Sequence, residues 1–342
     1  VICLYQDSKS SIWVGTLENG IYRINTNKEI VNYIHNESDK ETLSNNYIRT
    51  ICEDNFGNYW IGTSSGLNKL DSKTNKFTNY THLETDANSI SNSSIWSIIK
   101  DHQGTLWIGT FYGGVSLYNP EYSLSEYYNA SSKELSYSIV GKIIEDDSHN
   151  LWIATDGGGL NHLDRNSRTF AHYTHQPNAN TIPSNIIKDI WFDNINNHLW
   201  LGTHLGGLCR FDIRSKEAKR YNFPKNPGIG NNDIRSVVHY NNKLYLGTRN
   251  SVIVFDIKTE MAKPLIEDFV SESSQIWNMM IDSKERLWFS TSFAIFCYDL
   301  KSAKLKRYTY NQEQLGYIGE NYQNTFFEDK NKNIWLGSAG SG

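Results

Sequence analysis

Residue types that could perform acid–base, metal or nucleophilic chemistry are present in this chain, but their spacing does not assemble a catalytic group. His172 and His175 fall three residues apart in a predicted strand, and side chains at this spacing point to opposite faces. The adjacent carboxylates Glu53–Asp54 and Glu145–Asp146 diverge for the same reason. No GxSxG, HExxH or P-loop pattern occurs. The sequence therefore predicts no catalytic residue, no metal site and no cofactor.

Three further histidines and four cysteines do not change this prediction. His102, His149 and His198 fall in predicted turns, where we expect them to face solvent. The cysteines lie far apart in the chain, without CxxC spacing: Cys3, Cys52, Cys209 and Cys297. They are interpreted as buried small apolar side chains, and they leave the redox compartment open.

Aromatic rings beside charged side chains predict a different chemistry, the recognition of sugars. An aromatic face covers the C–H surface of a sugar ring, and arginine, asparagine or aspartate bonds to its hydroxyl or carboxylate groups. We predict that seven residues bind an oligosaccharide: Trp96, Tyr112, Asp156, His204, Arg235, Arg249 and Trp277. The alternative is that Trp96 and Trp277 only pack between structural units and that Arg49 and Arg235 pair with nearby carboxylates.

The elements that must position these residues follow from an internal repeat. A tryptophan, once replaced by tyrosine, recurs at intervals of 43 to 48 residues and is often followed by Gly-Thr and preceded by an Asp-x-x-Gly turn signal. These anchor residues are Trp13, Trp60, Trp107, Trp152, Trp200, Tyr245, Trp288 and Trp335. A period of about 40–50 residues is typical of a propeller or a solenoid.

Each copy of the repeat predicts four strands and no helix. Its short segments are rich in Ile, Val, Tyr, Phe, Trp and Thr and are separated by Asn, Asp, Gly or Ser. This is the pattern of an all-β propeller built of four-stranded blades, with each anchor ring in the wedge between two blades. Seven full copies predict a seven-bladed propeller over residues 1–321, and residues 322–342 would form the first two strands of a next blade. The alternative is a single eight-bladed ring.

The predicted site residues occupy two kinds of position in this repeat. One kind follows the second strand of blades three to six: Tyr112, Asp156, His204 and Arg249. The other kind falls near the start of an innermost strand: Trp96, Arg235 and Trp277. Loops on a rigid scaffold commonly carry function, and both kinds emerge at the same end of the blades. We therefore expect one arc of ligand-binding residues at the mouth of the central channel.

Composition limits the remaining classes of function. The 342 residues are 13% aromatic and 20% charged, which suits one large all-β domain. A formal net charge of −4 provides no basic face, so we expect no nucleic-acid partner. No apolar run reaches the length of a membrane span of about 18 residues. Because Val1 falls inside a predicted first strand and Gly342 follows a second one, we expect the chain to be part of a longer protein.

Two copies carry a pattern that resembles a known repeat. Ile95–Asn119 reads IWSIIKDHQGTLWIGTFYGGVSLYN, and Ile48–Asp71 is built in the same way. Leu43–Asn46 and Ser89–Ser94, which precede these copies, complete the likeness. The pattern resembles the two-component regulator propeller repeat, and the resemblance extends over essentially the whole chain.

This resemblance implies a role in signalling. It suggests the periplasmic sensor region of a Bacteroidetes hybrid two-component system, with a histidine kinase and response regulator elsewhere in the full-length chain. It further implies oligosaccharide recognition, control of polysaccharide utilisation, downstream domains of the same chain as partners, and a homodimer of the full-length protein. The fragment itself would then not be an enzyme. Two alternatives are a propeller lyase resembling streptogramin lyase and a plain protein-interaction propeller.

Overall fold

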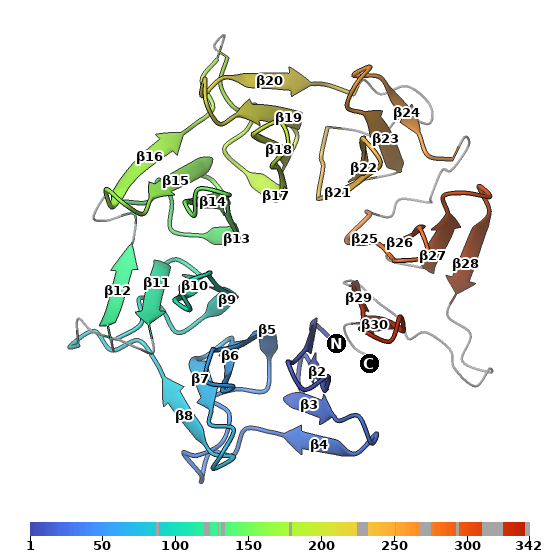
Figure 1. The fold of residues 1–342 in the computed structure, drawn as a ribbon. Helices are drawn as coiled ribbons and strands as arrows, with labels where there is room; N and C mark the ends of the chain where they lie inside the picture. The colour runs from blue at the N-terminus through green and yellow to red at the C-terminus, as the bar shows by residue number, and fades with distance from the viewer. Residues whose placement is uncertain are drawn as a thin grey trace. The chain divides into compact units, whose positions relative to one another are not determined.

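The computed structural model of this chain contains β-strands and no helix among the residues that it describes. These residues are 1–86, 89–119, 124–128, 130, 134–177, 180–223, 232–249, 251–266, 275–291, 294–309 and 324–338. Within them, no segment is a helix long and apolar enough to cross a membrane. Their strands form seven four-stranded sheets and one two-stranded sheet, drawn in Figure 1. The predicted fold class, an all-β propeller of seven four-stranded blades with a partial strand pair at the C-terminal side, is confirmed.

The strands of the first four blades follow one another in chain order. Blade one contains β1 (Cys3–Gln6), β2 (Ile12–Gly15), β3 (Ile21–Ile24) and β4 (Ile30–Tyr33). Blade two contains β5 (Ile48–Glu53), β6 (Tyr59–Thr63), β7 (Leu67–Leu70) and β8 (Phe77–Tyr80). Blade three contains β9 (Ile95–Lys100), β10 (Leu106–Thr110), β11 (Gly114–Asn119) and β12 (Leu124–Tyr128). Blade four contains β13 (Val140–Glu145), β14 (Leu151–Thr155), β15 (Leu160–Asp164) and β16 (Thr169–Tyr173).

The later blades continue the same order. Blade five contains β17 (Ile187–Asp193), β18 (His198–Thr203), β19 (Gly207–Asp212) and β20 (Ala218–Tyr221). Blade six contains β21 (Ser236–Tyr240), β22 (Lys243–Gly247), β23 (Val252–Asp256) and β24 (Ala262–Pro264). Blade seven contains β25 (Met279–Ile281), β26 (Arg286–Ser290), β27 (Ala294–Asp299) and β28 (Leu305–Thr309), and the final pair is β29 (Asn324–Glu328) and β30 (Ile334–Ser338). The predicted boundary between residues 321 and 322 lies outside the described residues, so the domain division stays a prediction.

The chain forms two compact units. The first is Val1–Ile153 with Leu163–Phe170, and the second is Ala154–His162 with Ala171–Ser341. Within the first unit the leading strands of successive blades touch, β1 with β5, β5 with β9 and β9 with β13. Within the second unit β17 touches β21, β21 touches β25, and β25 touches β29. Each unit thus repeats one arrangement of neighbouring blades.

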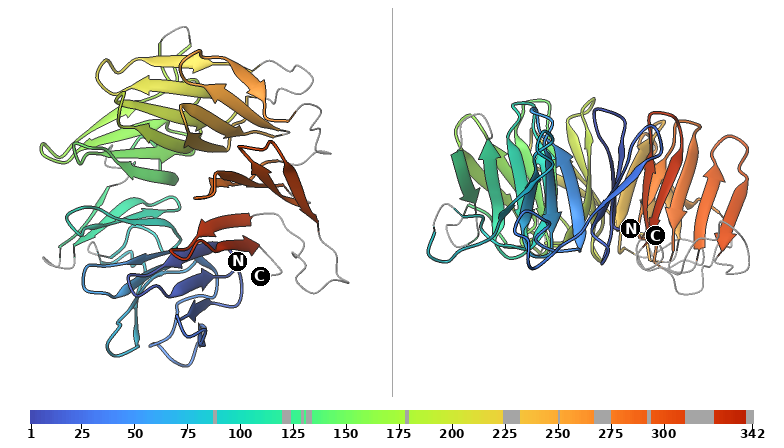
Figure 2. Two further views of the ribbon diagram at one scale, coloured as in Figure 1. Left: turned by 45° about the vertical axis from the view of Figure 1, so that its right-hand side comes forward. Right: turned by 90° about the horizontal axis from the view of Figure 1, so that it is seen from below.

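Antiparallel pairing sorts the connections of each blade to two opposite ends (Figure 2). In blade two, for example, β5, β6, β7 and β8 pair in sequence order and all antiparallel. The connection between the second and third strands and the connection to the next blade therefore lie at one end, here called the loop end. The turns between the first and second strands and between the third and fourth strands lie at the other, here called the turn end.

The anchor tryptophans form the core between blades, as predicted. Six of them are only 0–7% exposed: Trp13, Trp60, Trp107, Trp152, Trp200 and Trp288. Trp60 of blade two, for instance, packs with Ile95 and Leu106 of blade three. Burial of such a ring removes roughly 150–250 Å² from water, so the anchors account for much of the stability of each blade junction.

The recurring distance between aspartate and tryptophan in the repeat also allows a hydrogen bond between their side chains, which sequence analysis missed. The indole Nε1 of the anchor donates to the carboxylate six residues earlier at 2.7–3.0 Å in six copies: Trp13, Trp60, Trp107, Trp152, Trp288 and Trp335. The other oxygen of the same carboxylate closes the turn, as when Asp54 accepts from the backbone N–H groups of Phe56 and Asn58. The aspartate thus serves the turn and the core together.

Blade five departs from this arrangement because its turn is one residue longer. Asp193 precedes Trp200 by seven residues, and its carboxylate accepts instead from the side-chain amide of Asn196 at 2.8 Å. The indole nitrogen of Trp200 is buried without a hydrogen-bond partner. The ring is nevertheless 0% exposed, so apolar packing alone holds this anchor.

The glycine two residues after most anchors lies where neighbouring blades approach closely, as the sequence predicted. A Cβ atom on Gly62 would lie 2.6 Å from Cγ2 of Ile95 in the next blade. A Cβ atom on Gly15 would lie 2.7 Å from Cγ2 of Ile48. Any side chain at these positions forces the blades apart.

Candidate functional site

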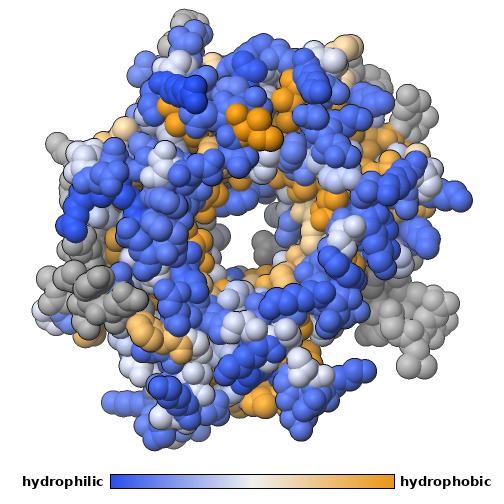
Figure 3. Space-filling view, in the orientation of Figure 1, coloured by the Kyte–Doolittle hydropathy of each residue, from blue (hydrophilic) through white to orange (hydrophobic). Residues whose placement is uncertain are grey.

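Hydrophilic residues cover most of the face shown in Figure 3, and exposed hydrophobic residues gather in separate patches. Two of the large side chains that remain exposed are among the predicted site residues, Trp96 at 44% and Tyr112 at 59%. Both lie at the loop end of blade three, Trp96 on β9 and Tyr112 in the connection between β10 and β11. Core packing does not explain why aromatic rings are exposed at adjacent strand ends.

Trp96 and Tyr112 belong to a continuous stack of five side chains, here called the aromatic ledge: Tyr47, Arg49, Trp96, Phe111 and Tyr112. The Arg49 guanidinium lies over the Tyr47 ring at 4.8 Å and over the Trp96 ring at 4.9 Å. Trp96 stacks on Phe111 at 5.6 Å, and Phe111 meets Tyr112 edge-on at 4.2 Å. The ledge therefore joins the loop ends of blades two and three within the first unit.

Hydrogen bonds fix the guanidinium at the centre of the aromatic ledge. Arg49 Nη1 donates to Ser94 Oγ at 2.6 Å and to the Ile95 carbonyl at 3.3 Å. Among the described residues, its other N–H groups have no acceptor, so they remain available to a ligand. Trp96 is 44% exposed and stacks on Phe111, so it both packs against its neighbour and presents surface to solvent.

Three other predicted residues meet in the second unit around one buried carboxylate. Asp233, 3% exposed, accepts from His204 Nδ1 at 3.0 Å and from Arg235 Nε at 3.2 Å. The Arg235 guanidinium lies over the Trp277 ring at 5.3 Å. The amide of Gln275, oriented with its oxygen toward Arg235, accepts from Nη2 at 2.8 Å. Arg235 thus pairs with a carboxylate, as the alternative interpretation allowed, and also faces an aromatic ring.

The last two predicted residues do not join these groups. Asp156, in the connection after β14, accepts from Lys188 Nζ of β17 at 2.9 Å. Arg249 lies exposed two residues after the end of β22. The predicted residues therefore fall into the aromatic ledge of the first unit, the Asp233 group of the second unit, the Asp156–Lys188 pair, and Arg249. A single arc through all of them stays a prediction.

Sequence reasoning missed Asp233 and Gln275 and did not connect Tyr47 with Arg49. Each missed residue stands two positions before a residue of the inner-strand set, as Asp233 before Arg235 and Gln275 before Trp277. These four residues lie in the connections before β21 and β25, so strand alternation does not apply to them. The recurring spacing of two residues was the signal that the sequence offered.

Several histidines of the chain have a structural role instead. After the fourth strands of blades one, two and four, a ring Nδ1 lies within hydrogen-bond distance of a carbonyl in the connection to the next blade. The pairs are His35 with Leu43 at 2.5 Å, His82 with Ile90 at 2.9 Å and His175 with Ile182 at 3.0 Å. These rings hold the blade connections at the loop end.

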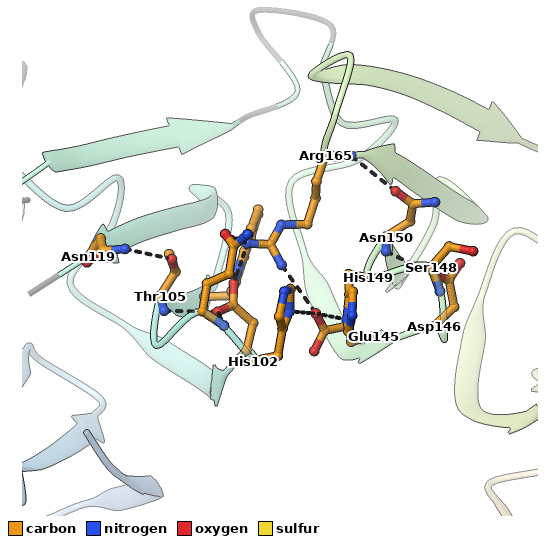
Figure 4. A network of polar contacts seen from close by, with 12 residues as sticks. His102, Thr105, Asn119, Glu145, Asp146, Ser148, His149, Asn150 and Arg165 are labelled. Atoms are coloured by element: carbon orange, nitrogen blue, oxygen red, sulfur yellow. Dashed lines mark hydrogen bonds and ion pairs between the residues drawn. The ribbon is translucent and has the colours of Figure 1, made fainter. Parts of the chain in front are cut away.

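The turn end of blades three and four carries a further cluster, shown in Figure 4. His102 follows the β9 strand, while Glu145 ends β13 and His149 lies in the next turn. Glu145 Oε1 lies 2.6 Å from Nδ1 of His102 and 3.4 Å from Nδ1 of His149. The two imidazoles stack with their centroids 3.5 Å apart. The prediction that these histidines merely face solvent is incomplete, because both contact one carboxylate.

The comparisons with known proteins agree with the repeat. The model of the two-component regulator propeller matches residues 42–65 and 89–112. The extracellular domain of what is described as a hybrid two-component system from B. thetaiotaomicron is similar at 25% identity and a TM-score of 0.67, covering 91% of this chain and 41% of that one. The chain thus spans less than half of that domain. No curated protein sequence matches the chain.

Two other solved structures share the fold at lower sequence identity. A second extracellular domain of a hybrid two-component system from B. thetaiotaomicron is similar at 19% identity and a TM-score of 0.52, covering 99% of this chain and 53% of that one. Virginiamycin B lyase from Staphylococcus aureus is similar at 15% identity and a TM-score of 0.56, covering 84% of this chain and 90% of that one. At these identities the likeness concerns the fold alone. The fold is thus a β-propeller, and two of its repeats match the two-component regulator propeller model.

Proposed function

We propose that this chain is the extracytoplasmic, ligand-sensing propeller of a hybrid two-component signalling protein and that its ligand is an oligosaccharide. The repeat match and the similarity to an extracellular domain of such a system support the sensor role. Under this proposal the chain lies in the periplasm and has no enzymatic activity of its own. It controls polysaccharide utilisation through downstream domains of the same protein, which include a histidine kinase and act in a homodimer.

The aromatic ledge is the observation that carries the ligand class. Trp96 and Tyr112 offer exposed ring faces and edges that suit the C–H surface of sugar rings. Arg49, held between two rings and anchored through Nη1, keeps further N–H donors for hydroxyl, carboxylate or sulfate groups. Because stacking and hydrogen bonds position these groups before a ligand arrives, binding requires little further ordering of side chains.

Calorimetric titration of the purified chain with a panel of neutral, carboxylated and sulfated oligosaccharides tests this proposal. We expect at least one glycan to bind, and Trp96→Ala to weaken it by about tenfold or more because a central aromatic contact is lost. Phe56→Ala is the matched control, since Phe56 is also an exposed aromatic residue but lies at the turn end. An equal loss of affinity in both variants, or none in Trp96→Ala, would place the ligand elsewhere.

The pairing of His204 with Asp233 justifies a test of one alternative function, that of a propeller lyase. A histidine within 3.0 Å of a buried carboxylate is a group that could act as a general base in a lyase. We expect no opening of the virginiamycin B ring by the purified chain, with or without added Mg²⁺. Turnover that is reproducible and lost in His204→Ala would establish the lyase function instead.

A further inference from the structure

The cluster of His102, Glu145 and His149 at the turn end brings together metal-ligand atoms from two blades. One ring nitrogen from each histidine and a carboxylate oxygen all lie within 4.8 Å of one another. Two donors on a tetrahedral zinc ion, with bonds of about 2.1 Å, lie about 3.4 Å apart. The separation of His149 Nδ1 from Glu145 Oε1 is already 3.4 Å. Small rotations of partly exposed side chains therefore suffice to enclose an ion.

Comparison with other blade junctions shows that this cluster replaces a simpler contact. In blades one and two, both the backbone N–H and the hydroxyl of Ser8 donate to the Glu53 carboxylate at 2.7 Å. Ser283 donates to Glu328 through the same two groups in the second unit. His102 occupies the serine position and Glu145 the glutamate position of the junction between blades three and four. Two imidazoles thus contact the glutamate at this junction, whereas a single serine contacts it at the other two.

The two rings and the carboxylate together form a ligand set for a transition-metal ion. The imidazoles stack at 3.5 Å with an angle of 21° between their planes, and both direct Nδ1 toward one carboxylate. Two imidazole nitrogens and a carboxylate oxygen suit zinc and neighbouring transition metals.

Arg165 contacts the same carboxylate oxygen as the two rings. Its Nη1 lies 3.2 Å from Glu145 Oε1, while its Nη2 pairs with the buried Asp101 carboxylate at 2.8 Å. Asp101 thereby offsets the arginine charge, which would otherwise weaken the binding of a nearby cation. Because Oε1 also lies close to both histidine nitrogens, Arg165 helps to orient the atom that would bind the ion.

We propose that His102, Glu145 and His149 form a binding site for a divalent transition-metal ion such as zinc, which joins the turn ends of blades three and four. Solvent fills the remaining coordination position, since the side chains are 37%, 22% and 55% exposed. The site lies at the opposite end of β9 and β10 from the aromatic ledge. The proposal therefore stands apart from sugar binding, and it revises the sequence prediction of no metal site.

The test is a titration of zinc chloride into tag-free full chain stripped with a chelator. We expect one zinc ion per chain and a rise in melting temperature with zinc concentration. His102→Ser should fold normally, because it recreates the serine–glutamate contact of the other junctions, but it should bind zinc at least about tenfold more weakly. His149→Gly should show the same loss. Cobalt(II) bound to wild type should show visible absorption that both variants lack.

A matched control separates this site from ordinary surface histidines. His198 also lies at a turn end and contacts one carboxylate, Asp212, at 3.4 Å. His198→Ala should leave zinc affinity unchanged. Wild type that binds zinc no better than His102→Ser, or binding that is lost in His198→Ala instead, would overturn the proposal and leave the cluster as a hydrogen-bonded junction only.

Discussion

At the scale of single residues, the repeat depends on an aspartate that performs two tasks with its two oxygens. In blade three, Asp101 Oδ1 accepts from backbone N–H groups of its turn, and Oδ2 accepts from the Trp107 indole at 2.7 Å. Because Trp107 is 2% exposed, that indole N–H has no access to water. A buried donor without a partner is unfavourable by about 1–3 kcal/mol, so the spacing of aspartate and tryptophan is a stability requirement.

Truncation of the anchor ring should therefore destabilise the fold strongly. Trp107→Ala should lower the free energy of unfolding by about 3–5 kcal/mol, because it leaves a cavity among the buried residues of blades three and four. Urea denaturation followed by circular dichroism measures the change. Phe56→Ala, which truncates an exposed ring, should change it by less than about 0.5 kcal/mol. Equal effects of the two substitutions would contradict the assigned role of the anchor.

The buried thiols make a prediction about alkaline pH. Burial raises the pKa of the Cys52 thiol to about 11 and that of the Cys209 thiol to about 12. The folded chain thus keeps protons that the unfolded chain loses above about pH 8.5. The contribution of the protonated thiols to the free energy of unfolding is complete at neutral pH, and it falls as the pH rises toward their raised pKa values. The urea midpoint should be lower at pH 9.5 than at pH 7.5, and Cys209→Ala should reduce the difference; a midpoint that rises with pH would refute this.

At the scale of elements, a blade is defined by strand alternation and by the close approach of its neighbour. The tryptophan spacing and the turn signals predicted the four strands of each blade, because both follow from local sequence. The pairings at Asp233 and at the aromatic ledge were not predicted, since they join residues from different segments. They depend on which face of a strand each side chain takes and on how blades meet, as with Arg49 of β5 and Trp96 of β9.

The close approach can be tested at Gly62. Gly62→Ala should lower the free energy of unfolding by about 1–3 kcal/mol, because the added Cβ would lie 2.6 Å from Ile95 Cγ2. Ile95→Ala in the same chain removes that methyl group. The loss in the double variant should therefore be smaller than the sum of the two single losses, a coupling that denaturation of all four chains measures. Strictly additive losses would contradict the contact.

At the scale of the whole molecule, the two ends of the blades carry different groups of side chains. In the first unit, the loop end carries the aromatic ledge and the turn end carries the histidine–glutamate cluster. The sequence predicted the fold class, and it predicted Trp96 and Tyr112 as neighbours on one ligand-binding surface. It did not predict the histidine–glutamate cluster, because Glu145 and His102 are 43 residues apart and meet only when blades pack.

The structure of the chain in complex with the tightest-binding glycan of the panel tests the central claim most directly. The account predicts a sugar ring stacked on Trp96 or Tyr112, with a hydroxyl, carboxylate or sulfate group within hydrogen-bond distance of the Arg49 guanidinium. A glycan bound at the turn end, or elsewhere on the chain with the aromatic ledge in contact with solvent only, would contradict it.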